Sequence, residues 1–173
     1  MPIQFAPAEM NAQILDNDEK IQIQSVVGTF ICYGCAVEPT VLTALHDMAT
    51  MQAKTTISML KQPTILMDYL VTYPNTKLHF YVGNMQQHLE SGAAYLLMPE
   101  AKSRIAAYFY LHSTPHAKKC YPKGYNAPIH VKCSTLKKFV SSAAEAECGG
   151  IFHNCTTAIG IRDTLHWNVT STR

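Results

Sequence analysis

The sequence contains little charge of either sign. Asp, Glu, Lys and Arg make up 15% of its 173 residues, whereas roughly 25% is usual in soluble domains. The net charge is only +2, which is too small to argue for nucleic-acid binding on its own. Hydrophobic residues reach 47%, a content that argues against intrinsic disorder. We therefore expect a folded chain whose surface is largely neutral or apolar.

Long hydrophobic runs are also missing. The uncharged segment Ile21 to Ala36 is interrupted by polar residues and glycine, so it falls short of the ~20 apolar residues that cross a bilayer. Residues Met1 to Gln13 have no basic start followed by an apolar run, as a secretory signal would. We expect no membrane segment and an intracellular protein, in the cytoplasm or nucleus, that is not secreted. The glycosylation sequons at Asn154 and Asn168 are then accidental.

Six cysteines do not predict disulfides in an intracellular chain of this length. Cys32 and Cys35 have the C-x-x-C spacing of redox dithiols and zinc sites, but they lie in an apolar helical pattern without a second ligand pair. Cys148, His153 and Cys155 could complete a zinc set only if the fold brought two distant helices together. We interpret these thiols as reduced structural cysteines.

The first half of the chain has helical periodicity. We expect an extended lead-in over residues 1–24, because no period is sustained there. Ser25 is the expected cap of the first helix, which is predicted to be buried on more than one side, and Thr40 is the expected cap of the second. Pro63 should kink or divide the third. The predicted helices cover residues 25–36, 41–51 and 55–73.

The second half changes to the pattern of strands and turns. Strands are expected within 78–97 and over 103–113 and 128–136, with a loop over 114–126. A long helix follows over 141–167, and its predicted packing stripe is Ala144, Cys148, Ile151, Phe152, Cys155, Ala158, Ile159, Arg162 and Leu165. The fold class is therefore α+β, with a helical N-terminal segment before a three-stranded antiparallel sheet and one long helix.

Six of the fourteen basic residues fall in one short stretch, where they could contact phosphates. The alternative is a set of solvated loop lysines. The residues are Lys118, Lys119, Lys123, Lys132, Lys137 and Lys138.

The start of the long helix, Ser141-Ser142-Ala143-Ala144-Glu145-Ala146-Glu147, carries two carboxylates. Acidic residues at a helix N-terminus stabilise the helix through its dipole, which is one interpretation of this motif. The motif also resembles the serine-rich Glu-Ala-Glu motif of copia-type retrotransposon polyproteins. Ser25 to Thr40 and the helix from Lys54 to Tyr73 are similar to that family's connection region after the reverse transcriptase. The resemblance extends from about Ser25 to Trp167.

The resemblance implies a connection region over residues 25–77 and a partial ribonuclease H-like domain over 78–173. In that family, acidic side chains hold two magnesium ions that cleave the RNA strand of an RNA–DNA hybrid. Carried over by position, Glu147 is a metal ligand and Glu145 points elsewhere. Gly92, in Ser91-Gly92-Ala93-Ala94-Tyr95, occupies the place of a metal-bridging aspartate.

A later acidic strand of the family has no counterpart, because the last acid, Asp163, falls within the predicted helix. Glu90 is a candidate substitute for the acid missing at Gly92, since it lies two residues earlier on the same strand face, but its carboxylate would start about 7 Å too far along the strand. The family is an RNA-directed DNA polymerase and ribonuclease H, but we expect this chain to lack nuclease activity and to bind no Mg²⁺.

Three other hypotheses stay open. The chain could be a residual metal-dependent ribonuclease that acts with Glu90 or with another chain. It could bind RNA–DNA hybrid or other nucleic acid through the lysines without catalysis. It could bind a protein partner or a second copy of itself through an exposed sheet edge.

Overall fold

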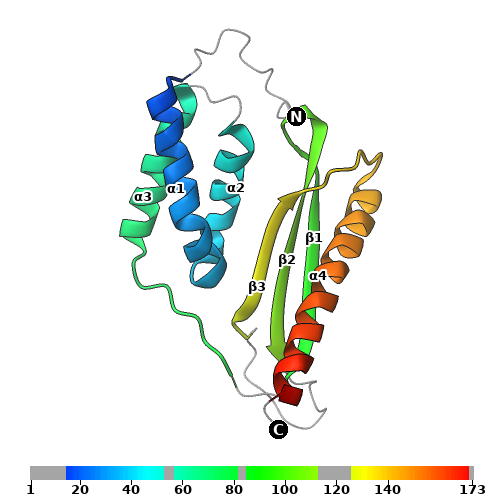
Figure 1. Cartoon of the computed structure of the whole chain (residues 1–173). Helices are drawn as coiled ribbons and strands as arrows, with labels where there is room; N and C mark the ends of the chain where they lie inside the picture. Colours follow the sequence, from blue (N-terminus) through cyan, green and yellow to red (C-terminus); the bar gives the residue numbers. More distant parts are fainter. Residues whose placement is uncertain (1–14, 53–56, 82–84, 113–125, 172–173) are drawn as a thin grey trace. The chain divides into compact units, whose positions relative to one another are not determined.

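The computed structural model describes residues 15–52, 57–81, 85–112 and 126–171. The chain has a mixed α+β fold, as its sequence predicts, with helices first and then a three-stranded antiparallel sheet and a long helix (Figure 1). It divides into two compact units, Met1–Lys77 and Leu78–Arg173. The change of sequence pattern falls at this boundary.

The first helix begins earlier than expected. Helix α1 spans Asn17–Ala36, so the prediction of an extended lead-in is wrong for residues 17–24. The backbone N–H of Asp16 donates to the Glu19 carboxylate at 3.0 Å, an arrangement typical of a capping box. Acids in the first turn also stabilise the helix dipole. This local start signal places the N-terminus of α1 eight residues before Ser25.

The next helices lie close to their predicted positions. The 3₁₀ turn η1 (Pro39–Val41) leads into α2 (Leu42–Met51), and η3 (Ile57–Leu60) leads into α3 (Lys61–Thr72). Pro63 lies in the first turn of α3, where its missing N–H breaks no helical hydrogen bond. It does not interrupt α3 itself, but the predicted helix over 55–73 is divided into η3 and α3 just before it.

Thr40 does not cap α2 as expected, because no side chain caps that helix. Its hydroxyl donates instead to the carboxylate of Glu38, which the Thr76 hydroxyl also contacts. Glu38 is only 4% exposed, and a buried carboxylate needs such donors. This acid therefore ties the turn before α2 to the segment that follows α3.

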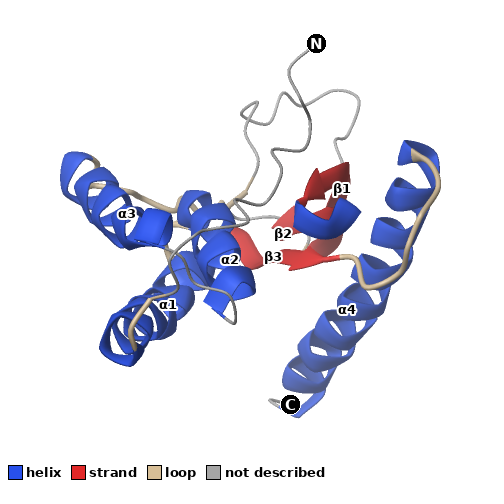
Figure 2. Ribbon diagram, turned by 90° about the horizontal axis from the view of Figure 1, so that it is seen from above, coloured by secondary structure: helices blue, strands red, loops and turns tan. Residues whose placement is uncertain are grey.

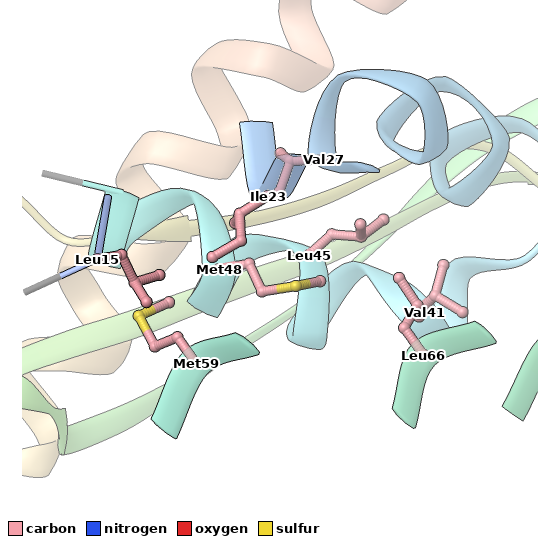
Figure 3. Packing of buried hydrophobic residues seen from close by; sticks show 8 residues of the cluster. All are labelled: Leu15, Ile23, Val27, Val41, Leu45, Met48, Met59 and Leu66. Atoms are coloured by element: carbon pink, nitrogen blue, oxygen red, sulfur yellow. The ribbon is translucent and has the colours of Figure 1, made fainter. Parts of the chain in front are cut away.

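The core of the N-terminal unit is a single cluster of buried apolar side chains (Figure 3). Helix α1 contributes a pair four residues apart and α2 a pair three residues apart, which keeps each pair on one side of its helix, and α3 contributes one residue. The members are Leu15, Ile23, Val27, Val41, Leu45, Met48, Met59 and Leu66.

Gly34 lets α1 approach the start of α2 closely. A Cβ atom added at Gly34 would lie 2.9 Å from Leu42 Cδ2 and 3.1 Å from Val41 Cγ2. Gly28, on the same helix, has nothing within 4 Å of such an atom. We expect Gly34→Leu to lower the free energy of unfolding of this unit by about 1–3 kcal/mol through overpacking.

Gly28→Leu is the matched control and should raise that free energy by about 0.5–1 kcal/mol, since glycine is a poor helix former. Urea denaturation followed by far-UV circular dichroism measures both. Equal effects of the two substitutions would contradict the close approach at Gly34.

The C-terminal unit contains a sheet in the order β1-β2-β3. Its strands are β1 (Gln86–Met98), β2 (Lys102–His112) and β3 (Pro128–Thr135), and the turn η4 (Pro99–Ala101) joins the first two. All neighbouring pairs are antiparallel, with Gly92 opposite Ala106 and Ala106 opposite Cys133. Residues 78–81 form no strand, and nearly all of the predicted loop lies outside the described residues.

Helix α4 (Ala143–Ser171) packs on β1 and, to a smaller extent, on β2. Figure 2 shows it on one side of the sheet. A Cβ atom added at Gly150 would lie 3.3 Å from Ile105 Cγ2 and 3.7 Å from Ala93 Cβ. Because no side chain separates the helix from the strands at this point, the two backbones come close together.

The predicted packing stripe of α4 is wrong. Ile151, Phe152 and Ile159 are 50%, 76% and 51% exposed, and the side chains on the sheet side include the fully buried Ala146 and Asn154. Small side chains allow close approach to a sheet, so the narrow side of this helix is the one that packs. None of the described helices is both long and apolar enough to cross a membrane.

Candidate functional site

The acidic motif at the start of α4 places its two carboxylates in different environments. Glu145 accepts hydrogen bonds from the Ser141 N–H at 2.7 Å and the Ser141 hydroxyl at 2.8 Å. These bonds lower the pKa of Glu145. Its own N–H donates to the Ser142 hydroxyl at 3.1 Å, as in a capping box. Glu145 therefore stabilises the helix start, whereas Glu147 makes no such bond in the described structure.

Three contacts define which side of α4 faces β1. The Gln87 amide donates to the Ala158 carbonyl at 3.1 Å, and the Asn154 amide donates to Ser91 Oγ at 2.8 Å. Gly150 lies over Ala93, so α4 runs antiparallel to β1. Glu147 precedes Asn154 by seven residues, or two turns, and so lies on the same side of the helix. We infer that Glu147 faces the part of β1 just beyond Ala93.

Glu90 and Gly92 lie on the other face of the sheet. Ser91 and Ala93 face α4, and side chains alternate along a strand. A Cβ atom added at Gly92 would meet nothing within 4 Å, which agrees with an open face. An aspartate at position 92 would therefore point away from α4.

The structure does not bring the predicted metal ligands together. Glu90 and Glu147 lie on opposite faces and are offset by four to five strand residues, or about 15 Å along β1. Asp163 lies within α4, as its sequence position predicts. Among the described residues, no group of three or more His, Cys, Asp or Glu side chains could hold a metal ion. The residues present do not fit the magnesium that the resemblance implies.

A shallow hollow of about 400 Å³ lies on the sheet face opposite α4. Gly92 and Ala106 form its floor, and Glu90, Tyr108 and Val131 surround it. The Tyr108 hydroxyl donates to the Asn126 carbonyl at 2.9 Å, and burial together with the Glu90 charge raises the pKa of Tyr108. The hollow offers one carboxylate and a neutral phenol, so it can accept hydrogen bonds but presents no activated nucleophile.

The lysine cluster does not form one surface in the described structure. Lys118, Lys119 and Lys123 lie outside the described residues. Lys132 donates to the Thr157 hydroxyl of α4 at 2.9 Å, and burial lowers its pKa. Lys137 and Lys138 are exposed between β3 and α4. Lys132 therefore contributes to packing between β3 and α4.

His130 lies beside Lys132 on the same face of β3. Burial lowers the pKa of His130, and the charge of Lys132 lowers it further. The unfolded state then binds a proton more readily than the folded state, so the stability from neutral His130 is complete above about pH 6.5. It is lost as pH falls through the folded pKa.

We expect His130→Gln to remove the decrease in unfolding free energy that protonation of His130 causes below about pH 6.5. Lys132→Met should raise the pKa of His130, because it removes one of the two causes. A titration of the imidazole Cε1–H signal by NMR measures the pKa directly. An unchanged His130 pKa in Lys132→Met would contradict the assigned cause.

The cysteine predictions meet a different environment from the one expected. Cys32 and Cys35 are free thiols exposed on α1, so the prediction that this helix is buried on more than one side is wrong. Burial raises the pKa of Cys35, and the nearby Cys32 raises it further. The raised pKa disfavours the reactive thiolate. Cys148 and Cys155 are exposed on α4.

Two asparagines that the sequence did not identify as structural join separate segments through their side-chain hydrogen bonds. Asn126 joins the segment before β1, the end of β2 and the start of β3. Asn154 is fully buried against the sheet, so its sequon cannot accept a glycan in the folded chain. Only the small residues at 146, 150 and 158, which share four-residue spacing with Asn154, could have indicated its role.

No protein-family model matches the chain, and no curated protein or solved structure matches it. The function must therefore be argued from the residues and their geometry.

Proposed function

We propose that this chain is a retroelement-derived polyprotein fragment with a ribonuclease H-like C-terminal unit that lacks nuclease activity. The resemblance of Ser141 to Glu147 and its neighbouring segments to copia-type polyproteins supports the origin. The separation of Glu147 from both Glu90 and Gly92 supports the lack of nuclease activity. Position 92 has no side chain, and the two acids lie on opposite faces of the sheet.

The chemistry explains why this separation matters. Two-metal hydrolysis needs carboxylates that converge on ions about 3.5–4 Å apart. Mg²⁺ binds oxygen ligands at about 2.0–2.1 Å, in nearly ideal octahedral geometry. Glu90 and Glu147 cannot meet that requirement across a β-sheet. One carboxylate alone would hold a hydrated ion weakly and could not position an attacking water.

The test is cleavage of a labelled RNA–DNA hybrid with Mg²⁺ or Mn²⁺. We expect no cleavage by the full chain or by Glu147→Gln, with both proteins giving a folded circular dichroism spectrum. Metal-dependent cleavage that Glu147→Gln abolishes would contradict the proposal and would require a different set of metal ligands.

Gly92→Asp sharpens the same test. If glycine at position 92 were the only defect, this substitution would restore a metal ligand and raise the cleavage rate. We expect no cleavage, because the new carboxylate points away from α4. Cleavage by Gly92→Asp that is lost in Gly92→Asp with Glu147→Gln would show that positions 92 and 147 converge.

The position of β1 favours a binding role as the second candidate. β1 is a thirteen-residue strand at one edge of the sheet, and no described strand pairs with its outer side. Unpaired edge strands can add a strand from another chain. Self-association through this edge would appear as protection of outward-pointing β1 amides from hydrogen exchange at high protein concentration.

A further inference from the structure

The side of α4 that faces away from the sheet carries an apolar stripe. We call this set the outer stripe: Cys148, Ile151, Phe152, Cys155 and Ile159. Phe152 is 76% exposed, both isoleucines are about half exposed, and both cysteines are exposed. The steps of three and four residues keep all five side chains on one side of the helix.

The opposite side of the same helix packs on the sheet. Gly150 and Asn154 face β1 and β2, so the outer stripe cannot contact them. No Asp, Glu, Lys or Arg occurs between Glu147 and Arg162. The side of an amphipathic helix that faces solvent normally carries charged or polar residues. The outer stripe instead exposes apolar side chains, and the sheet of this unit does not cover them.

The charges at the two ends of the outer stripe indicate what covers it. Glu145 lies before the stripe and Arg162 after it, and both are exposed. If two copies paired with parallel helices, Glu145 would face Glu145 and Arg162 would face Arg162. Antiparallel pairing puts Glu145 of each copy near Arg162 of the other, which is favourable. Asp163 lies beside Arg162 and accepts its guanidinium N–H at 3.1 Å, so part of that charge is already paired.

We propose that the outer stripe is a self-association surface, where α4 pairs antiparallel with α4 of a second copy about a two-fold axis. If Glu145 of one copy lies opposite Arg162 of the other, the numbers of any two residues that lie opposite each other across the axis add up to 307. The same register puts Phe152 opposite Cys155 of the second copy and Cys148 opposite Ile159. The stripe is thus complementary to itself, as a two-fold interface must be. This inference does not depend on whether the chain cleaves nucleic acid.

The size of the outer stripe determines how strong a dimer we expect. It is about 17 Å long at 1.5 Å per residue, and it offers on the order of 400 Å² of apolar surface per copy. Stable interfaces bury about 800 Å² per partner. We therefore expect a weak dimer whose population rises with protein concentration.

Sedimentation velocity over a concentration series tests the surface. Phe152→Glu should weaken the dimer at least about tenfold, because it places a charge at the centre of the interface. Phe80→Glu is the matched control, since Phe80 is 63% exposed but lies outside α4. It should leave the dimer unchanged. Equal effects of both substitutions, or a monomer at millimolar concentration, would overturn the proposal.

Disulfide trapping with diamide tests the antiparallel register. Because Cys32, Cys35 and Cys148 are also exposed, all cysteines except Cys155 are first replaced by serine. In that chain Phe152→Cys should form a cross-linked dimer through Cys155 of the second copy, and adding Cys155→Ser should abolish that cross-link. A cross-link that persists after Cys155→Ser would join the two introduced cysteines, would indicate parallel pairing and would overturn the register. Hydrogen exchange separates the two surfaces, because concentration-dependent protection confined to β1 would assign the dimer to the sheet edge.

Discussion

Replacing Asn126 by alanine is expected to lower the free energy of unfolding of the C-terminal unit by about 3–5 kcal/mol. The Asn126 side chain accepts from the Tyr81 N–H at 2.8 Å, and donates to the Tyr81 carbonyl at 3.1 Å and to the Leu111 carbonyl at 2.5 Å. It also accepts from the Ala127 N–H at 3.1 Å. Alanine would remove this partner from the Tyr81 N–H and from the Tyr81 and Leu111 carbonyls, whereas the Ala127 N–H would keep its hydrogen bond to the His79 carbonyl at 2.9 Å.

The measurement is hydrogen exchange of the β2 and β3 amides, because it reports the C-terminal unit separately from the N-terminal one. Asn126→Asp is the informative comparison, since it keeps an acceptor for the Tyr81 N–H but turns a buried carboxylate toward two carbonyls. At pH 7 we expect a loss of protection at least as large as in Asn126→Ala. A loss below about 1 kcal/mol in Asn126→Ala would show that water replaces these hydrogen bonds.

Asn154→Asp is the second substitution with a large expected effect. Asn154 is 0% exposed, and its amide nitrogen donates to Ser91 Oγ at 2.8 Å and to the Ala106 carbonyl at 3.1 Å. An ionised carboxylate has no donor and would face that carbonyl in a buried place. We expect a loss of about 3–5 kcal/mol of unfolding free energy at pH 7.

The pH dependence of this loss identifies its cause. Burial raises the pKa of the new carboxyl above its value in the unfolded chain, so the folded state holds the proton more tightly. The penalty should be small below about pH 4 and should grow as pH rises toward the folded-state pKa. Asn154→Ala also loses both donors but adds no charge, so its cost should not change between pH 4.5 and 7.5. Equal pH profiles for the two variants would contradict the explanation.

The sequence predicted elements with a strong local signal. The three strands and the long helix have the periodicity or turn residues that define them, and the structure contains all four. Apolar periodicity does not mark the start of α1, because the deciding signal is polar and lies in Asp16 and Glu19. Pro63 predicted a division of the helix expected over 55–73, and the structure divides that range into η3 and α3 just before it.

The orientation of α4 could not be predicted from hydrophobicity alone. Ile151, Phe152 and Ile159 suggested the packing side, because large apolar side chains normally define the core. The sheet instead selects the side with Gly150 and Asn154, since a long helix approaches a sheet closely only where its side chains are small. The outer stripe follows directly from that choice.

The separation of the candidate metal ligands could not be predicted from the sequence either. Sequence order places Glu90, Gly92 and Glu147 on a strand and a helix, but it does not give the strand face that the helix covers. Pairing of Ser91 with Asn154 fixes that face and separates the acids. A contact between one serine and one asparagine therefore decides which residues can share a metal.

Paramagnetic broadening by Mn²⁺ tests the central claim most directly, because it locates a bound ion without requiring catalysis. Mn²⁺ is titrated into the ¹⁵N-labelled full chain, and the amide signals of Glu90, Gly92 and Glu147 are followed by NMR. We predict weak, non-saturable broadening near each carboxylate, with no site common to residues 90–92 and 147. Saturable broadening of both regions with one dissociation constant, lost in Glu147→Gln, would show a shared metal site and contradict the account.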